Sequence, residues 1–549
     1  MVLPREVCWV PRVERGKSGE RKNEGTMAQQ KSDRRVVPQG RRKAIPTVAF
    51  EKRRGGKATS VEQQTCQLGL QFGTAENPGE TGPGVAVEAE ARQRVPATHA
   101  APKPNVKEKR ATSAMMGEVT NRLRAAFAKV ASNKGSPGPD RQSIEDVRKH
   151  LDVVLVQLED ALRNETYRPG DIRRVWIPKA GGSERGLGIP NVIDRVVQEA
   201  VRQVLEPLYE PTFHGSSHGF RPGRSCHTAV AEAKQHLEEG YEWVVDLDLE
   251  KFFDRVNHQR LMARLAERVW DRSLLVLIGR MLKVAVVMPD GVRVSTEEGV
   301  PQGGPLSPLL SNVVLDELDR ELSQRGHRFV RYADDCNIYV RSERAGKRVM
   351  ESVVSFIERR LRLKVNVAKS AIARPEERHF VGFRLRHEPL DGEVEVLLSV
   401  RSKERIDSRI RELTPRTWGS SLKACILQVN EYLVGWLGFF KICSPGVETT
   451  LGNLDAHIRR RLRALMLADW KRKLVMVRKL IQLGVRSKTA WRSIYDGRKS
   501  IWKLSHSSAV DRGLRNAYFA ERGLVSLRER WREYHEHIVA PKQLTLALG

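Results

Sequence analysis

The sequence predicts an α+β protein, with short strands in the middle of the chain and helices on both sides. Residues 172–178 alternate apolar and polar side chains as a strand does, and residues 243–249 form an apolar run with two acids, typical of a buried strand. Residues 328–340 have the pattern of two strands joined by a tight turn. Strands grouped together and followed by a long helical stretch indicate an α+β fold.

Helical periodicity covers the segments around these strands. Apolar residues recur every three or four positions between residues 113 and 162, interrupted by a Gly/Pro-rich loop, and a second run covers 194–208. Beyond about residue 400 the pattern is again mostly helical. Residues 1–112 are first basic and then rich in Gly, Pro, Ala and Glu, without helical period. They predict a basic, disordered N-terminal extension.

The charge of the chain indicates a polyanionic partner. Its 96 Lys and Arg exceed its 67 Asp and Glu, giving a net charge of +29. Residues 401–549 contribute +17 (30 minus 13), and residues 1–57 contribute +10 (16 minus 6). Nucleic acid is the first partner to expect, and a ribosome-like structural role or a membrane-surface role is the alternative.

Other classes of protein are excluded or disfavoured by composition. The sequence has no apolar run of membrane-spanning length and begins with no apolar segment of signal-peptide type, so we expect a cytoplasmic protein that makes no membrane contact. The six cysteines form no CxxC pair and no zinc-finger spacing with histidines. They predict free thiols and no zinc.

Three carboxylates in apolar strand surroundings are the sharpest chemical signal. Asp334 and Asp335 lie at the turn of the 328–340 unit, and Asp248 ends the 243–249 run. A buried charge is costly unless it is paired or binds a metal. Three converging acids could hold two Mg²⁺ ions, which clamp the attacking and leaving oxygens of an in-line phosphoryl transfer. A polar turn is the alternative explanation for an isolated Asp-Asp pair.

Tyr332-Ala-Asp-Asp335 resembles the catalytic box of reverse transcriptases, and the neighbouring segments resemble, in order, the blocks of the group II intron reverse transcriptase–maturases. These segments are Lys134–Asp140, Arg185–Pro190 with Asp194–Gln198, Gly219–His227, Asp248–Asp254 with Asn257 and His258, Gly299–Pro308, Leu363–Asn366 with Lys369, and Phe380–Phe383. The resemblance covers about residues 115–535. It departs at Gly186, where the family usually has proline.

The resemblance implies a right-hand polymerase followed by a helical domain. The fingers would span 113–240, the palm with its antiparallel sheet 241–395, and the thumb and maturase domain 396–549. It implies an RNA-directed DNA polymerase that also promotes splicing, with two Mg²⁺ ions and deoxynucleoside triphosphates. Its partners would be group II intron RNA, an RNA template with a DNA primer, and target DNA. The sequence after His535 is too short for the nuclease of longer members, so we expect no endonuclease activity.

The resemblance also implies roles for individual residues. Asp248, Asp334 and Asp335 would bind the metals, with the backbone carbonyl of Leu249. Asp246 is the less favoured ligand. Phe253 would lie under the incoming sugar and exclude a 2′-hydroxyl, although core packing is the alternative. Lys179 and Arg185 would contact the triphosphate, and Gln302 would hold the nucleotide from above; these three residues could instead belong to solvated loops or turns.

Contacts with nucleic acid are expected in three places. Arg221, Arg224 and His227 are predicted to contact the template, with a structural loop as the alternative. Lys369 would approach the primer or the nucleotide. In the C-terminal region, Arg459, Arg460, Arg461, Lys471, Arg472 and Lys473 are predicted RNA contacts, with a solvated helix face as the alternative. Its tryptophans could stack on unpaired bases, although helical spacing is more typical of core residues.

Two other functions remain open from the sequence. One is a splicing factor with an idle polymerase site, which the intact acids and the intact Pro301–Gly304 loop disfavour. The other is a group II-like reverse transcriptase used in DNA repair or defence, which the maturase-like C-terminal region disfavours. An RNA-dependent RNA polymerase would share the two-metal chemistry, but Phe253 favours deoxynucleotides.

Overall fold

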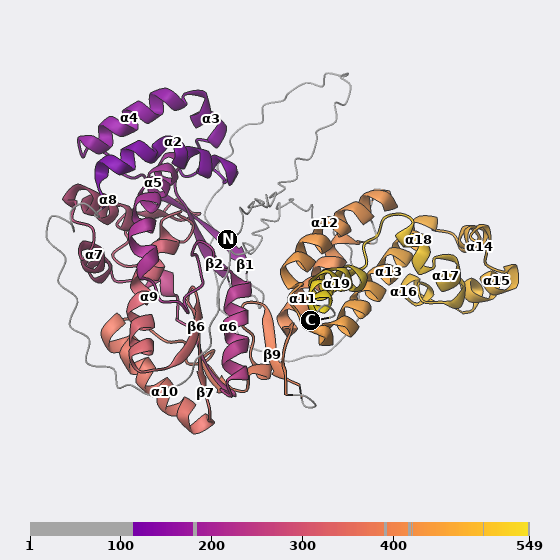
Figure 1. The fold of residues 1–549 in the computed structure, drawn as a ribbon. Helices are drawn as coiled ribbons and strands as arrows, with labels where there is room; N and C mark the ends of the chain where they lie inside the picture. Colours follow the sequence, from indigo (N-terminus) through magenta and orange to yellow (C-terminus); the bar gives the residue numbers. More distant parts are fainter. Residues whose placement is uncertain are drawn as a thin grey trace, which may run out of the picture. The chain divides into compact units, whose positions relative to one another are not determined.

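The computed structural model describes residues 114–178, 184–388, 392–415, 419, 421–497 and 499–546, with side chains up to residue 536. The predicted N-terminal extension and Lys179 lie outside the described residues. Figure 1 shows an α+β protein, as the sequence predicts. None of the described helices is long and apolar enough to cross a membrane.

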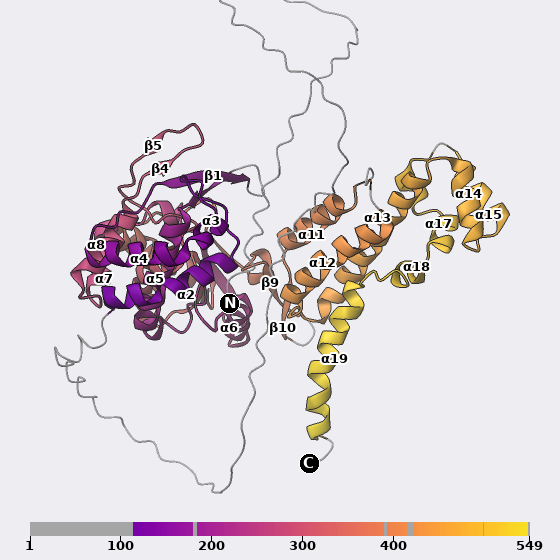
Figure 2. The same ribbon diagram turned by 90° about the horizontal axis from the view of Figure 1, so that it is seen from above.

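The first described helices form a packed layer in the fingers. They are α2 (Met116–Ser132), α3 (Ile144–Lys149), α4 (Leu151–Arg163) and α5 (Val192–Tyr209), and α2 packs along α5 (Figures 1 and 2). Leu123, Phe127 and Val130, whose spacing predicts a helix, are buried in this layer. Ser143 begins α3 with a capping box that it forms with Asp146, which satisfies backbone N–H groups of the first turn.

A four-stranded sheet lies next along the chain. Strands β1 (Ile172–Pro178) and β2 (Glu184–Ile189) are antiparallel, and β4 (Val286–Val287) and β5 (Arg293–Val294) extend the sheet in the order β2-β1-β4-β5. Gly186 lies opposite Trp176 in this ladder. Its carbonyl accepts a hydrogen bond of 3.0 Å from Arg174, so the departure from proline leaves the strand intact.

The palm sheet has the order β6-β7-β3-β8. Its strands are β3 (Trp243–Leu247), β6 (Arg328–Tyr332), β7 (Asp335–Val340) and β8 (Ala371–Ala373), and all neighbours are antiparallel. Alternate residues of β3 belong to different cores: Val245 and Leu247 to one, Val244 to the other. The sheet is therefore covered on both faces, which explains why its strands are almost entirely apolar.

Helices cover these two faces. The helices α6 (Cys226–Glu238), α9 (Ser307–Gln324) and α10 (Glu343–Phe356) contact the palm sheet, and α7 (His258–Ala266) and α8 (Arg272–Leu282) join the same core as α9. The strands β9 (Phe383–His387) and β10 (Val394–Leu398) form a separate antiparallel hairpin. The predicted domain boundary between residues 395 and 396 is wrong, because it falls inside β10; the helical part begins after Ser399, the N-cap of α11.

The C-terminal part is helical, as predicted. Its longer helices are α11 (Val400–Leu413), α12 (Leu422–Phe440), α13 (Glu448–Trp470), α14 (Lys473–Gln482), α15 (Ser487–Tyr495) and α19 (Leu527–Leu546), and three short ones, α16 (Ile501–Leu504), α17 (Ser508–Gly513) and α18 (Asn516–Ala520), precede α19. One apolar core joins them, with Val429, Leu433 and Leu437 of α12 almost fully buried. Trp531 is buried in this core, whereas Trp491 is 43% exposed.

Candidate active site

The predicted acids meet at one end of the palm sheet. Ala333 and Asp334 form the two-residue turn between β6 and β7, and Tyr332 pairs with Asp335. Ala333 adopts a left-handed conformation with φ of 57°, as such turns require. Leu247 of β3 pairs with Cys336, so the next residue of each strand, Asp248 and Asp335, are neighbours. Local turn chemistry and strand register thus place the three acidic residues at the same end of the sheet.

The electrostatics of this cluster favour a cation. Burial and the charge of Asp248 raise the pKa of Asp334, which nearby Arg185 partly offsets. The pKa of Asp335 is raised to about 7, because the surrounding protein displaces water from its carboxylate and because three other acids, Asp334, Asp246 and Asp248, lie near. One side of the residue still meets solvent. Like charges crowded in a poorly hydrated place destabilise their ionised forms, and a divalent cation relieves this repulsion.

Asp246 and Asp248 differ in how their charges are neutralised. Asp246 accepts a hydrogen bond of 2.8 Å from Arg378 Nε and a second from the same guanidinium. Asp248 Oδ2 is sealed from solvent and accepts no hydrogen bond within the described part of the chain; its ion-pair partner is Lys369, with Nζ at 3.4 Å. Lys369 has a side chain 65% exposed, so it can leave easily. This difference favours Asp248 as the ligand.

Two backbone hydrogen bonds of its neighbours leave the carbonyl of Leu249 free of the adjacent 364–366 segment. The amide of Glu250 donates to the Lys364 carbonyl, and the amide of Asn366 donates to the Asp248 carbonyl, both at 2.8 Å. These bonds flank the antiparallel bridge between Leu249 and Val365. In this pattern, the N–H and C=O of Leu249 point away from the 364–366 segment.

The residues fit a metal site by chemistry, although their side chains are not drawn together. Among the described residues, no three His, Cys, Asp or Glu side chains stand close enough to hold a metal ion in their present positions. Asp248 Oδ2, which accepts no hydrogen bond among the described residues, and the mutually repelling acids of the turn are the donor set that a hard cation prefers. A cation at this site would replace Lys369 as the partner of Asp248.

The predicted nucleotide contacts are also neighbours. Arg185 Nε donates to Gln302 Oε1 at 2.9 Å, and the Gly188 amide donates to the Gln302 carbonyl at 2.7 Å. Gly303 has φ of 122°, and a Cβ there would lie 2.3 Å from the Gly188 carbonyl oxygen, so this approach of loop and strand requires glycine. Phe253 is 8% exposed. Its carbonyl accepts a 2.6 Å bond from Val300, which precedes the Gln302 loop.

Arg331 is a site-supporting residue that the sequence analysis missed. Its side chain is fully buried, and all five of its N–H groups are used. It binds Asp319 through two bonds (2.7 and 2.6 Å), Asn312 at 3.1 Å, Ser217 at 2.7 Å and the Ala333 carbonyl at 2.8 Å. An arginine inside an otherwise apolar strand was the available signal. It ties α9 and the 217 loop to the turn that presents Asp334.

Several predicted template contacts are used inside the protein. The prediction for Arg221 is wrong: it is 6% exposed and donates to the Glu210 carboxylate and the backbone carbonyls of Glu210, His214 and Ser217, as the structural-loop alternative requires. Arg224 donates to the Gly215 carbonyl. The His227 ring lies 2.7 Å from the Phe439 carbonyl through Nε2, which joins α6 to α12.

The predicted RNA contacts of the C-terminal region divide into two groups. Arg461 donates to Thr414 and to the Arg411 carbonyl, capping the end of α11, and Arg460 stacks 4.1 Å above the Trp502 ring. Both side chains are half-buried, so helix packing uses part of each guanidinium group and their RNA contact stays a prediction. Lys471 and Arg472 are exposed between α13 and α14, and Arg459 and Lys473 are half-buried.

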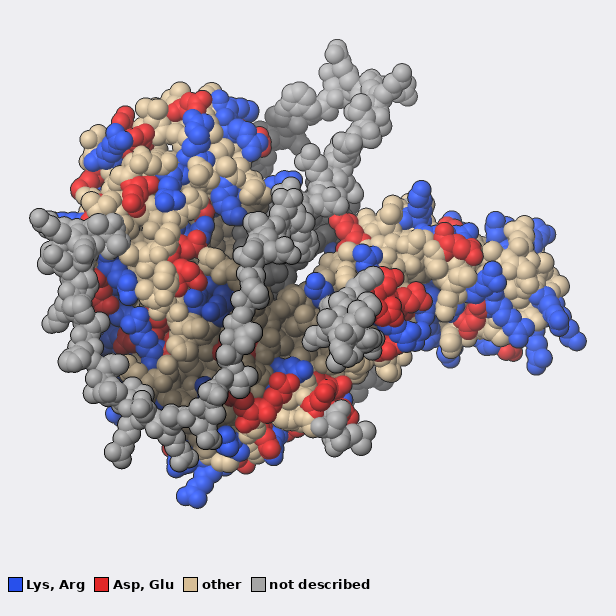
Figure 3. All heavy atoms as spheres, viewed as in Figure 1, with Lys and Arg blue, Asp and Glu red and all other residues tan. Residues whose placement is uncertain are grey.

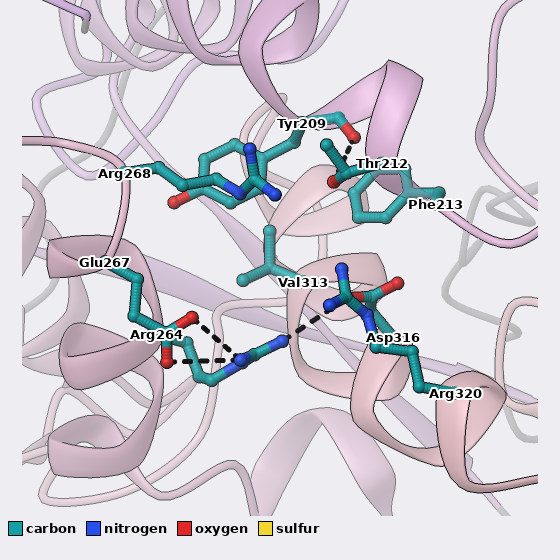
Figure 4. Close-up of a pocket in the computed structure, with 9 residues that line it drawn as sticks. All are labelled: Tyr209, Thr212, Phe213, Arg264, Glu267, Arg268, Val313, Asp316 and Arg320. Atoms are coloured by element: carbon teal, nitrogen blue, oxygen red, sulfur yellow. Dashed lines mark hydrogen bonds and ion pairs between the residues drawn. The ribbon is translucent and has the colours of Figure 1, made fainter. Parts of the chain in front are cut away.

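A small polar cavity is lined by none of the three acids of the site. It has a volume of about 30 Å³, which is room for about one water molecule. Figure 4 shows its lining: Tyr209, Thr212, Phe213, Arg264, Glu267, Arg268, Val313, Asp316 and Arg320. Among the described residues, Asp316 Oδ1 and Arg264 Nε are buried without hydrogen-bond partners, and both residues line this cavity.

The comparison with known families follows the same division of the chain. Residues 177–385 match the family model described as reverse transcriptase (RNA-dependent DNA polymerase). Residues 403–482 match the group II intron, maturase-specific domain. The chain belongs to the group II intron reverse transcriptase–maturases. The first match contains all three acids, and the second begins in α11 and ends at the last residue of α14.

Individual relatives agree with this family. Protein YkfC of Escherichia coli is 32% identical over 338 residues, which are 54% of this chain and 88% of YkfC. The putative COX1/OXI3 intron 2 protein of Saccharomyces cerevisiae is 26% identical, over 63% of this chain and 46% of that protein. The group II intron-encoded protein LtrA of Lactococcus lactis is 30% identical, over 38% of this chain and 34% of LtrA. The chain thus spans less than half of the two intron proteins.

Proposed function

We propose that this reverse transcriptase–maturase copies its intron RNA into DNA at the palm while its C-terminal helices bind the same RNA and promote splicing. The observation that supports it best is the cluster of Asp248, Asp334 and Asp335 at one sheet end, with Arg185 close enough to influence Asp334. Acids that lie close together without compensating charges destabilise the fold, and metal binding for catalysis accounts for this cost, whereas an idle polymerase site does not.

The proposed chemistry assigns a task to each residue. Two Mg²⁺ ions held by the three acids and the Leu249 carbonyl would supply Lewis-acid stabilisation of the attacking and leaving oxygens. Arg185 neutralises charge on the triphosphate, and its bond to Gln302 fixes the guanidinium in place. Phe253, only 8% exposed, would lie under the incoming sugar and leave no room for a 2′-hydroxyl. The template RNA, the DNA primer and the target DNA belong to the proposal.

Primer extension tests the polymerase function. We expect full-length protein to extend oligo(dT) on poly(rA) with Mg²⁺, and the Asp334→Ala/Asp335→Ala variant to lose at least about 10³-fold in rate, since several kcal/mol of stabilisation is lost. Asp152→Ala, an acid of α4 whose side chain is 83% exposed, is the matched control and keeps full activity. Equal rates in the wild type and the double variant would refute the assignment.

Splicing tests the maturase function separately. A group II intron RNA, transcribed from the sequence that flanks the gene, is incubated at low Mg²⁺ with and without protein. We expect protein to accelerate splicing, and the Asp334→Ala/Asp335→Ala variant to do so as well as the wild type, because binding of folded RNA does not need the palm acids. A splicing rate that protein leaves unchanged would remove the maturase role.

A further inference from the structure

Helix α15 presents a pair of exposed aromatic rings. Trp491 is 43% exposed and Tyr495 is 45% exposed, one helical turn apart, and their rings stack with centroids 5.0 Å apart and an angle of 26°. Ala490 and Ile494, which lie on an adjacent face of the helix, are fully buried and anchor α15 to the core. Trp491 and Tyr495 lie at the edge of this buried face and keep much of their ring surface in solvent.

The surface around this pair is strongly basic. Residues 471–497 contain eight Lys and Arg against one acid, Asp496, a charge of +7. Asp496 already pairs with Lys499 at 2.6 Å, while Lys488 and Arg492 are exposed on α15 beside Trp491. Figure 3 shows Lys and Arg side chains gathered over α14 and α15. Exposed aromatic rings within a basic field are the two elements from which single-stranded nucleic acid is bound.

The geometry of the rings defines where a base would lie. Lys473 Nζ is 5.2 Å from the Tyr495 ring centroid, and Trp491 stacks on the same ring, so Tyr495 already has two neighbours. Among the described aromatic contacts, Trp491 stacks on Tyr495 alone, and with 43% of the residue exposed it offers ring surface to a base. Every base presents a π-face to such a ring, and a base inside a duplex cannot reach it.

We infer that Trp491 and Tyr495 form a stacking platform for an unpaired nucleotide of RNA, whose flanking phosphates contact Lys488 and Arg492. The site lies beyond residue 482, where the match to the maturase-specific domain ends. The choice of RNA rests on the proposed function, in which the C-terminal helices hold the RNA that the palm copies. The platform extends this grip from backbone attraction to bases in loops and bulges.

Binding of short oligonucleotides to the full chain tests the platform. The palm is first saturated with a blunt RNA–DNA primer–template duplex, and the affinities of (rA)12, (dA)12 and a 12-base-pair RNA duplex are then measured by fluorescence anisotropy. Base stacking on one ring corresponds to a loss of about 5- to 100-fold on removal, so we expect Trp491→Ala to weaken (rA)12 by this factor and leave the duplex unchanged. Trp491→Phe retains most of the affinity.

Two controls separate stacking from other effects. Trp270→Ala removes a tryptophan with a similar exposure of 40% from a loop outside the C-terminal domain, and it keeps wild-type binding. Lys488→Gln/Arg492→Gln lowers the salt dependence of (rA)12 binding, by about 0.7 in the log–log slope for each phosphate that the protein no longer neutralises.

Three results would overturn the inference. They are unchanged (rA)12 binding in Trp491→Ala, an equal loss for (rA)12 and the duplex, and a loss confined to (dA)12. Primer extension by the same preparations distinguishes this from failure of the proposed function: an inactive wild type refutes the polymerase, whereas an active wild type with unchanged (rA)12 binding in Trp491→Ala refutes only the platform.

Discussion

The palm and the C-terminal helical domain both contain many charged residues, but they use them in opposite ways. In the palm, Arg331 is fully buried with all its donors bound, and it holds the turn of the catalytic acids. In the helical domain, Arg461 is half-buried and caps α11, and other cations such as Lys471 remain exposed. Charge serves geometry in the first region and is divided between packing and RNA attraction in the second.

The largest expected effect breaks the buried pair of the palm. Arg331→Met leaves Asp319 as an unpaired buried carboxylate, and removal of one partner of a buried ion pair costs about 3–5 kcal/mol. Unfolding in urea, followed by circular dichroism, measures this loss.

A second variant shows whether the pair supplies stability or position. Arg331→Met/Asp319→Leu removes both charges, and we expect it to recover most of the stability but not the polymerase rate, because the Ala333 carbonyl still loses its donor. A double variant with full polymerase activity would show that Arg331 only fills space.

The equivalent change in the helical domain is expected to cost less. Arg461→Met removes the hydrogen bonds to Thr414 and the Arg411 carbonyl at the end of α11, where water can replace part of them. A loss of about 1–2 kcal/mol is expected for bonds from a charged donor. Because the guanidinium group serves packing, the affinity for intron RNA at constant salt should not change; a clear loss of affinity with unchanged stability would support the RNA-contact prediction.

This contrast explains how far the sequence predicts the site. The turn of Asp334 and Asp335 depends on local strand and turn patterns, and Asp248 on a neighbouring strand, so both were predictable. The role of Arg331 depends on Asn312 and Asp319 of α9 and on Ser217, which only the tertiary fold brings near. For the same reason, Arg221 and Arg461 were predicted as nucleic-acid contacts: arginine has the same pattern whether a carbonyl or a phosphate accepts its bonds.

Tryptophan shows the same limit. Trp491 and Trp531 occur in similar helical sequence, yet one is 43% exposed and the other 4%. Helical periodicity alone does not predict which face of a helix packs in the core, because the aliphatic parts of Lys and Arg side chains can also cover apolar surface.

Exposed cations should affect binding without affecting stability. Lys471→Gln/Arg472→Gln changes two exposed residues, so the free energy of unfolding should stay within about 0.5 kcal/mol of the wild type. If both contact phosphates, the log–log slope of RNA affinity against salt falls by about 1–2. Filter binding of intron RNA at several salt concentrations measures it, and an unchanged slope would assign these residues to a solvated helix face.

The smallest effect concerns two histidine–carboxylate pairs, one in the helical domain and one in α6, beside the palm sheet. Burial lowers the pKa of His457, and nearby arginines reinforce the shift against the charge of Asp407, 3.2 Å away. A histidine whose folded pKa lies below its unfolded value of about 6.5 stabilises the fold above that pH, and the contribution is lost as the pH falls below it.

In α6, beside the palm sheet, burial favours the neutral form of Glu232, but its hydrogen bond with His218 and the proximity of His236 outweigh it and hold the pKa of Glu232 well below its ordinary value. That carboxylate stays ionised between pH 7.5 and 5.5. Over this range His457→Gln should therefore reduce the acid-induced fall of the melting temperature by a small amount, at most about 2 °C, whereas Glu232→Gln should lower the melting temperature about equally at both pH values. Differential scanning fluorimetry of the two variants decides whether the acid sensitivity belongs to the helical domain, and an unaltered pH profile in His457→Gln would exclude that histidine as its source.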